Sequence, residues 1–144
     1  MRTINDDFAI RPVATPGGWT ASAQYGSWID MTKYRRALFV VINGELDADA
    51  TIAAFEATDN AGAGAQALSG LTGTFTNGTH EGYVGLIEVL KEDMTLTYDF
   101  LTLRITTGAT DTIAAIALLG DIATDYPALN RNNSTDKVAF NVGG

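Results

Sequence analysis

The chain contains few side chains that commonly serve as general bases or nucleophiles. His80 is the only histidine and there is no cysteine, so one chain has neither a Cys–His pair nor a multi-histidine metal site. His80 stands next to Glu81 among Gly and Thr residues, and a loop or strand-edge histidine is the simpler interpretation of this pattern. We expect no catalytic residues and therefore a protein that is not an enzyme.

The acidic residues after the first apolar run resemble the start of a calcium-binding loop. Glu45, Asp47 and Asp49 alternate with other residues, but a glycine at the bend and a bidentate acid at the end of the loop are missing. We interpret this segment as a solvated acidic connection and expect no metal. A hydrolase with two catalytic carboxylates stays an alternative among the 17 acids, because linear spacing does not fix the distance between them.

One glycine-rich segment formally matches a dinucleotide-binding pattern. The run Gly62-Ala-Gly-Ala-Gln-Ala67 fits G-x-G-x-x-A, which binds a pyrophosphate only when a strand precedes it and a helix follows. Ser69, Gly70 and Gly73 would break such a helix within a turn or so. The sequence therefore predicts a flexible loop here and no nucleotide or other cofactor.

Composition and charge limit the partners. The chain has 144 residues, 46% hydrophobic and 18% charged, with a net charge of −8, which is typical of one folded domain that repels nucleic acid. The apolar runs Ala37–Ile42 and Ile113–Gly120 are much shorter than the roughly 20 residues that cross a bilayer. The first residues lack the apolar region of a secretion signal. We expect synthesis in a cytoplasm and no membrane or nucleic-acid partner.

The predicted elements are short strands separated by Gly- and Thr-rich turns. Thr51–Thr58 could form a strand or two helical turns, and we interpret it as a strand. Phe100, Thr102, Arg104 and Thr106 alternate with apolar residues, which predicts one wet and one buried face. The segment 111–119, which follows closely, is suited to pair with strand 100–106 as a hairpin. The predicted strands are 37–42, 51–58, 83–90, 100–106 and 111–119.

These patterns indicate an all-β, single-domain protein over residues 1–144, either a β-sandwich or a jelly-roll-like barrel. Residues 1–24 contain Pro12, Pro16 and two glycines and predict an extended N-terminal arm, followed by a β body over 25–125. Residues 126–144, which include Val138–Val142, form a final strand or a C-terminal arm. Open strand edges of such a sandwich favour a homo-oligomer, for which we expect a trimer.

Aromatic and basic side chains gather at the exit of the predicted arm. Aromatic residues in this position either close the core or anchor a neighbouring subunit, and the sequence leaves both interpretations open. The adjacent arginines could pair with acids of a neighbour or lie at a solvated edge. The candidate interface residues are Trp19, Tyr25, Trp28, Tyr34, Arg35 and Arg36.

The segment Gly26-Ser-Trp-Ile-Asp-Met-Thr-Lys-Tyr-Arg-Arg-Ala-Leu-Phe-Val-Val41, the run Glu56-Ala-Thr-Asp59 and the β-rich second half together resemble a group of small virion proteins. These are acidic, cysteine-free proteins of tailed phages and prophages, in which a Trp-Ile-Asp segment precedes the first core strand. The resemblance covers residues 25–125. It implies a cement or decoration protein that sits on the outer surface of the virion head and clamps the major capsid protein, often as a trimer, without catalytic residues.

Two other functions without catalysis fit the same composition. A tail or head-closure protein would share the features of a virion protein. A carbohydrate-binding β-sandwich would use exposed aromatic rings such as Trp19 and Trp28 as a stacking platform.

Overall fold

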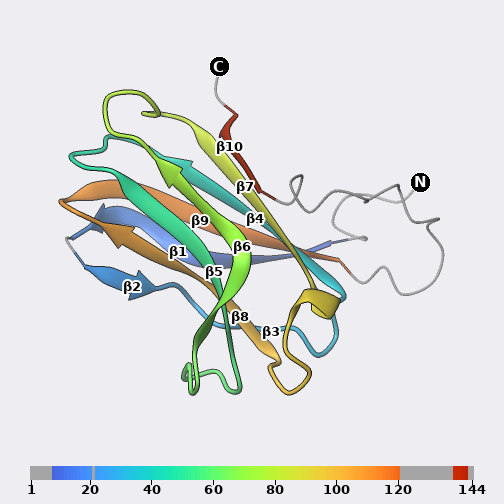
Figure 1. Ribbon diagram of the computed structural model, residues 1–144. Coiled ribbons are helices and arrows are strands. Elements are labelled where there is room, and N and C mark those ends of the chain that lie inside the picture. The colour runs from blue at the N-terminus through green and yellow to red at the C-terminus, as the bar shows by residue number, and fades with distance from the viewer. Residues whose placement is uncertain (1–7, 21, 121–137, 143–144) are drawn as a thin grey trace, which may run out of the picture.

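The computed structural model describes residues 8–20, 22–120 and 138–142. Two antiparallel sheets pack face to face (Figure 1), which confirms the all-β sandwich. In sheet A the strand order is β1-β9-β4-β7-β10, and in sheet B it is β2-β8-β5-β6, with β3 also paired to β8. The strands are β1 (Phe8–Trp19), β2 (Ala23–Tyr25), β3 (Ile29–Asp30), β4 (Arg36–Asn43), β5 (Ala50–Ala57), β6 (Gln66–Phe75), β7 (Val84–Leu90), β8 (Phe100–Thr107), β9 (Asp111–Gly120) and β10 (Val138–Val142), and a short 3₁₀ turn, η1, covers Lys91–Asp93.

The strand pairs are nested along the chain. The innermost pair is β5 with β6, and outside it lie β4 with β7, β2 with β8, and β1 with β9. Successive pairs belong alternately to sheet B and sheet A, so the chain behaves like one long hairpin wound around the core. This is jelly-roll connectivity, and it selects the jelly roll from the two architectures that the sequence left open.

The core fills the space between the sheets. Sheet A contributes Phe39, Ile87 and Ile113, and sheet B contributes Leu103 and Ile105, all with no exposed surface. Each of these residues lies on the inward side of a strand because successive side chains of a strand point to opposite faces. The predicted strands around residues 37–42, 51–58, 83–90, 100–106 and 111–119 are all present, and each lies within or overlaps an observed strand.

The prediction that residues 1–24 form a separate arm is wrong for the part that the structure describes. β1 pairs with β9 from Phe8↔Gly120 to Trp19↔Asp111, and Val13 and Ala14 are buried in the core. Prolines are tolerated in β1 because it is an edge strand with register shifts, where missing N–H groups and bulges cost little. Residues 1–7 lie outside the described residues.

At the C-terminal end, the strand alternative is correct for the residues that the structure describes. Val138–Val142 forms β10, which pairs with β7 at the edge of sheet A. The rest of the segment 126–144 lies outside the described residues.

Two further expectations about the second half of the chain are wrong. β9 is not a hairpin partner of β8, because the chain crosses after β8 to the other sheet and β9 inserts between β1 and β4. Thr102 does not lie on a wet face: it has no exposed surface, and its hydroxyl donates a hydrogen bond to the Ser27 carbonyl at 2.9 Å. The segment before β3 lies against β8 there, so it removes Thr102 from water.

Candidate interaction surface

The outward side of sheet A is apolar across four strands. Neighbouring strands place Leu38 between Leu118 and Glu88, Val40 between Ile116 and Leu86, and Ile42 between Ala114 and Val84. On β1, Ile10 and Pro12 continue the first two rows. We call this surface the sheet A outer face and define it by Ile10, Pro12, Leu38, Val40, Ile42, Val84, Leu86, Ala114, Ile116 and Leu118.

The sheet A outer face is open at several places. Ile10, Ile42 and Ile116 are 46%, 50% and 39% exposed. These are β-branched side chains on an edge strand and on two inner strands of the sheet. A sheet with one wet face normally carries polar residues on its outward side, so this surface is unusually apolar for a strand face in contact with water.

Charged groups stand only at one end of the sheet A outer face. Arg36 and Glu88 approach to 3.8 Å, and the Arg36 guanidinium lies 5.8 Å from the centre of the Phe8 ring. Among the outward side chains described on β1, β9, β4 and β7, Glu88 is the only acid. Although the chain has a net charge of −8, the described part of this face therefore carries a single acid.

The outward side of sheet B has a different character. Thr51, Thr74 and Thr106 lie in one row across the sheet, and the first two hydroxyls are 3.3 Å apart. Next to this row, Tyr25 lies 5.3 Å from the Phe55 ring, and the Arg104 guanidinium lies 4.2 Å from the same ring. Hydroxyls and one cation make this face polar, which is the ordinary pattern for a wet sheet face.

A shallow groove of about 410 Å³ runs between β1 and the segment that leads into β4. Trp28, Tyr34, Arg11, Asp30 and Lys33 are among its lining residues. Hydrogen bonds from the Thr32 hydroxyl and backbone N–H, at 2.7 and 2.8 Å, lower the pKa of Asp30 below its ordinary value. The groove thus offers an indole, a phenol, two cations and a carboxylate to a small polar ligand.

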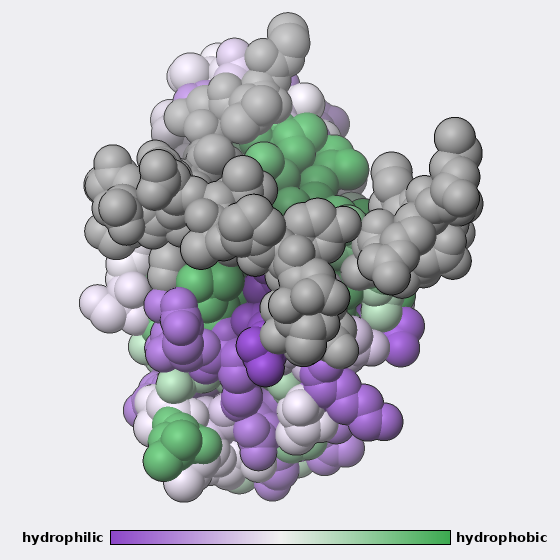
Figure 2. Space-filling view, turned by 90° about the vertical axis from the view of Figure 1, so that its right-hand side faces the viewer, coloured by the Kyte–Doolittle hydropathy of each residue, from purple (hydrophilic) through white to green (hydrophobic). Residues whose placement is uncertain are grey.

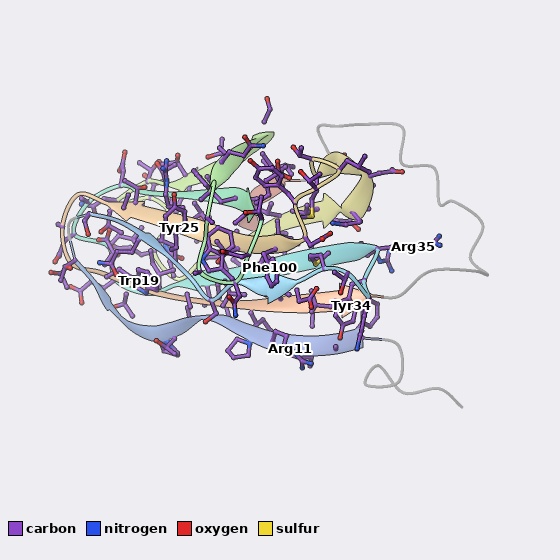
Figure 3. The ribbon with its side chains drawn as sticks, turned by 90° about the horizontal axis from the view of Figure 1, so that it is seen from below. Arg11, Trp19, Tyr25, Tyr34, Arg35 and Phe100 are labelled. Atoms are coloured by element: carbon purple, nitrogen blue, oxygen red, sulfur yellow. The ribbon has the colours of Figure 1, made fainter. Side chains whose placement is uncertain are left out.

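The six candidate interface residues do not form one patch. Trp19 closes the core, since its indole N–H donates to the Ile113 carbonyl at 3.0 Å. Figure 3 shows Trp19 and Tyr25 toward one end of the sandwich and Tyr34 and Arg35 toward the other. The six residues divide into the inward Trp19, the contacting pair Tyr25 and Trp28 with ring centres 5.5 Å apart, the groove residue Tyr34, the exposed Arg35 and the sheet A residue Arg36.

The acidic segment after β4 wraps around a buried carboxylate. Asp111 has no exposed surface, and its Oδ1 accepts hydrogen bonds from the backbone N–H groups of Asp47 and Ala48 at 2.7 and 3.2 Å. Asp49 accepts from the Asn77 N–H at 2.9 Å. These carboxylates fix backbone turns. Within the described ranges, no three His, Asp or Glu side chains lie close enough together to hold a metal ion.

His80 and the glycine-rich segment, the other motifs singled out in the sequence, lie largely in connections between strands. His80 lies in the turn between β6 and β7, where its Nδ1 accepts the Thr76 N–H at 2.8 Å. In the segment Gly62–Ala67, residues 62–65 form a loop, Gln66 and Ala67 begin β6, and within the described residues no helix follows. Both observations agree with the loop interpretations.

Sequence reasoning missed two features. The first is the sheet A outer face. The sequences of β4 and β9 could have indicated it, because their outward positions are apolar rather than polar. The second is Glu56, which is 1% exposed and accepts hydrogen bonds from Gln66 and Thr95. The alternation of β5 indicates this burial: Glu56 is two residues after Ala54 and four after Ile52, so its side chain points to the same inward side as theirs.

Figure 2 shows apolar surface in the upper half of one side of the molecule and mainly hydrophilic surface in the lower half.

In the part of the chain that the structure describes, no helix has the length and apolar character needed to cross a membrane.

Comparison with known proteins gives only a distant structural likeness. No family model matches the chain, and no curated protein matches it. A solved structure from work describing Bacillus endospore appendages as "a novel family of disulfide-linked pili" is similar at 15% identity and a TM-score of 0.45, covering 85% of this chain and 97% of the other.

Proposed function

We propose that this chain is a structural subunit that functions by docking against other protein surfaces, in the specific role of a decoration protein on the head of a tailed phage. The observation that carries the docking role is the sheet A outer face. Contiguous apolar patches of a few hundred Å² on soluble proteins are often functional. The resemblance of residues 25–125 to small virion proteins supplies the specific role.

In this role the chain would bind the outside of the assembled head and bridge subunits of the major capsid protein. A protein that binds the assembled lattice but not its free subunits stabilises the lattice by mass action. Tyr25, Trp28, Tyr34 and Arg35 are the candidate capsid contacts, since they lie away from the sheet A outer face and include the 43% exposed Tyr25. Other positions in the virion, in the tail or at the head closure, would use the same docking surfaces.

The test uses heads of the tailed phage or prophage that carries the gene for this chain. Purified protein is mixed at micromolar concentration with expanded heads stripped of decoration and with unexpanded procapsids, and both are sedimented. We expect saturable binding to expanded heads and none to procapsids. A Tyr25→Ala variant should bind more weakly, and Leu96→Ala, which changes a 95% exposed loop residue, should bind like the parent. Failure to bind expanded heads would refute the capsid role.

The groove supports carbohydrate binding as a second candidate function. Aromatic rings beside charged hydrogen-bonding groups are typical of sites that hold small polar ligands, and Trp28 and Tyr34 line the groove together with Arg11 and Asp30. Trp19 is not among the lining residues of this groove. Binding on a glycan array that is lost in Tyr34→Ala would support this function, and an empty array would count against it.

A further inference from the structure

We propose that copies of this chain associate through the sheet A outer face, so that the occupant of this apolar surface is a second copy of the same protein. The inference rests on the proposed structural role, and it says which protein covers the sheet A outer face. It follows from three properties of the face: its pattern, its size and its charge.

The strands of the two sheets differ in pattern. In β8 of sheet B, the outward Arg104 and Thr106 are polar, whereas in β4 of sheet A the outward Leu38, Val40 and Ile42 are all apolar. β9 repeats the apolar pattern with Ala114, Ile116 and Leu118. Strands that are apolar on both sides are characteristic of sheets covered on both faces. The core covers the inward side, and the apolar outward side favours a second protein layer there.

The face has the size of the centre of a protein interface. Four strands about 4.8 Å apart and five residues that each advance about 3.3 Å give a footprint of about 300 Å². A standard interface removes about 800 Å² from water on each partner and has an apolar centre inside a polar rim. Here Arg36 on β4 and Glu88 on β7 supply rim charges beside the apolar centre.

Charge favours a second copy over an arbitrary acidic surface. With a net charge of −8, two copies repel each other when their acidic surfaces meet. The sheet A outer face is the exception, because its only described acid, Glu88, lies 3.8 Å from Arg36. Two copies that meet here bring apolar rows together, and Glu88 is the only acid among the described outward side chains of β1, β9, β4 and β7. Sheets already pack in this way inside the molecule, where the inner faces of sheets A and B form the core.

The chain permits a direct test because it contains no cysteine. A single cysteine is introduced as Ile116→Cys at the centre of the face or as Leu96→Cys in the loop after η1, which is the matched control at a 95% exposed apolar position. Both proteins are treated with a short bis-maleimide at micromolar concentration. We expect covalent dimers from Ile116→Cys and only background cross-linking from Leu96→Cys.

A second pair of variants measures the association itself by sedimentation. The parent should have a mass of more than one chain. Ile116→Glu should weaken the association at least tenfold, because a carboxylate buried at an apolar centre has no partner, and Leu96→Glu makes the same charge change away from the face and should leave the mass unchanged. Amide hydrogen exchange of Ile116→Glu verifies that β9 remains folded; if it does not, Ile42→Glu on β4 replaces it.

Three results would overturn the proposal. The first is a parent protein with the mass of one chain at micromolar concentration. The second is an oligomer that Ile116→Glu and Ile42→Glu leave intact. The third is a monomer in which the thiol of Ile116→Cys is protected from reagents, which would mean that another segment of the same chain covers the face. None of these results decides head binding: a monomer that binds expanded heads refutes only the self-association, and an oligomer that does not bind them refutes only the capsid role.

Discussion

Replacing the buried carboxylate of Glu56 by an amide tests how much one polar group contributes to this sandwich. Glu56 lies in β5, is 1% exposed, and accepts three hydrogen bonds. Oε1 accepts from the Gln66 amide and from the Thr95 hydroxyl, both at 2.6 Å, and Oε2 accepts from the Thr95 backbone N–H at 2.8 Å. The side chain thus ties β6 and the loop after η1 to the centre of sheet B.

The Glu56→Gln variant keeps the shape of the side chain but turns one acceptor into a donor. If the amide oxygen takes the place of Oε1, the amide nitrogen faces the Thr95 N–H, and one hydrogen bond to a charged acceptor is lost. Such a bond contributes about 1.5–3 kcal/mol, and an unsatisfied buried donor adds to the loss. We expect Glu56→Gln to lower the free energy of unfolding by about 2–3 kcal/mol. Glu56→Ala removes all three bonds and leaves a cavity, so its loss should exceed about 4 kcal/mol.

The control is Glu81→Gln, which makes the same change of charge at an exposed position. It should alter stability by no more than about 0.5 kcal/mol. Urea unfolding of the three proteins measures the difference: a loss of about 2 kcal/mol lowers the midpoint by about 1 M when the slope is about 2 kcal/mol per M. If Glu56→Gln and Glu81→Gln unfold at the same urea concentration, the hydrogen bonds of Glu56 do not stabilise the fold in the way argued here.

Three more predictions address individual contacts. Leu103→Ala should lower stability by about 2–5 kcal/mol through loss of core packing, and Thr102→Ala by about 1–2 kcal/mol through loss of the bond to Ser27; urea unfolding measures both, and no effect at Thr102 would contradict its burial. Gly62→Ala should cost more than Gly78→Ala in thermal unfolding, because both have positive φ but only at Gly62 does a Cβ approach a ring, that of Trp28, to 2.8 Å; equal losses would argue against that contact. The contribution of Asp30 to stability should be present above pH 3.8 and be lost as the pH falls through its lowered pKa; an NMR titration should give a midpoint below 3.8 that Thr32→Ala moves back toward this value.

Five strands, β4, β5, β7, β8 and β9, could be predicted from the sequence because side-chain alternation is a local property, whereas β1 and β6 were not predicted as strands. Leu101, Leu103 and Ile105 have no exposed surface, as their period of two indicates. Thr102 escaped this reasoning because its burial depends on Ser27, 75 residues away in the chain. Alternation specifies which side a residue faces, but it does not specify what covers that side.

Pairing was harder to predict than strand position. Pro12 and Pro16 suggested an arm, yet an edge strand needs hydrogen bonds on one side only and can therefore contain proline. The short connection from Thr107 to Asp111 suggested a hairpin, but the same length also carries the chain from one sheet to the other. Local signals do not distinguish these cases, because the partner of each strand is set by residues far away in the chain.

The candidate site shows the same division between local and distant information. Single aromatic residues drew attention in the sequence, and the structure separates them: Trp19 is hydrogen-bonded to β9 and Tyr34 lines the groove. The sheet A outer face consists instead of ordinary aliphatic residues, and it becomes a surface only when β1, β9, β4 and β7 lie side by side. This face can be recognised by comparing the outward residues of the two sheets: Val40 and Ile116 are apolar in sheet A, whereas Thr51 and Thr106 are polar in sheet B. A jelly roll that met water equally on both sides would have no reason for this contrast. This contrast is the reason we propose a covering protein layer on the aliphatic face rather than on the outer face of sheet B.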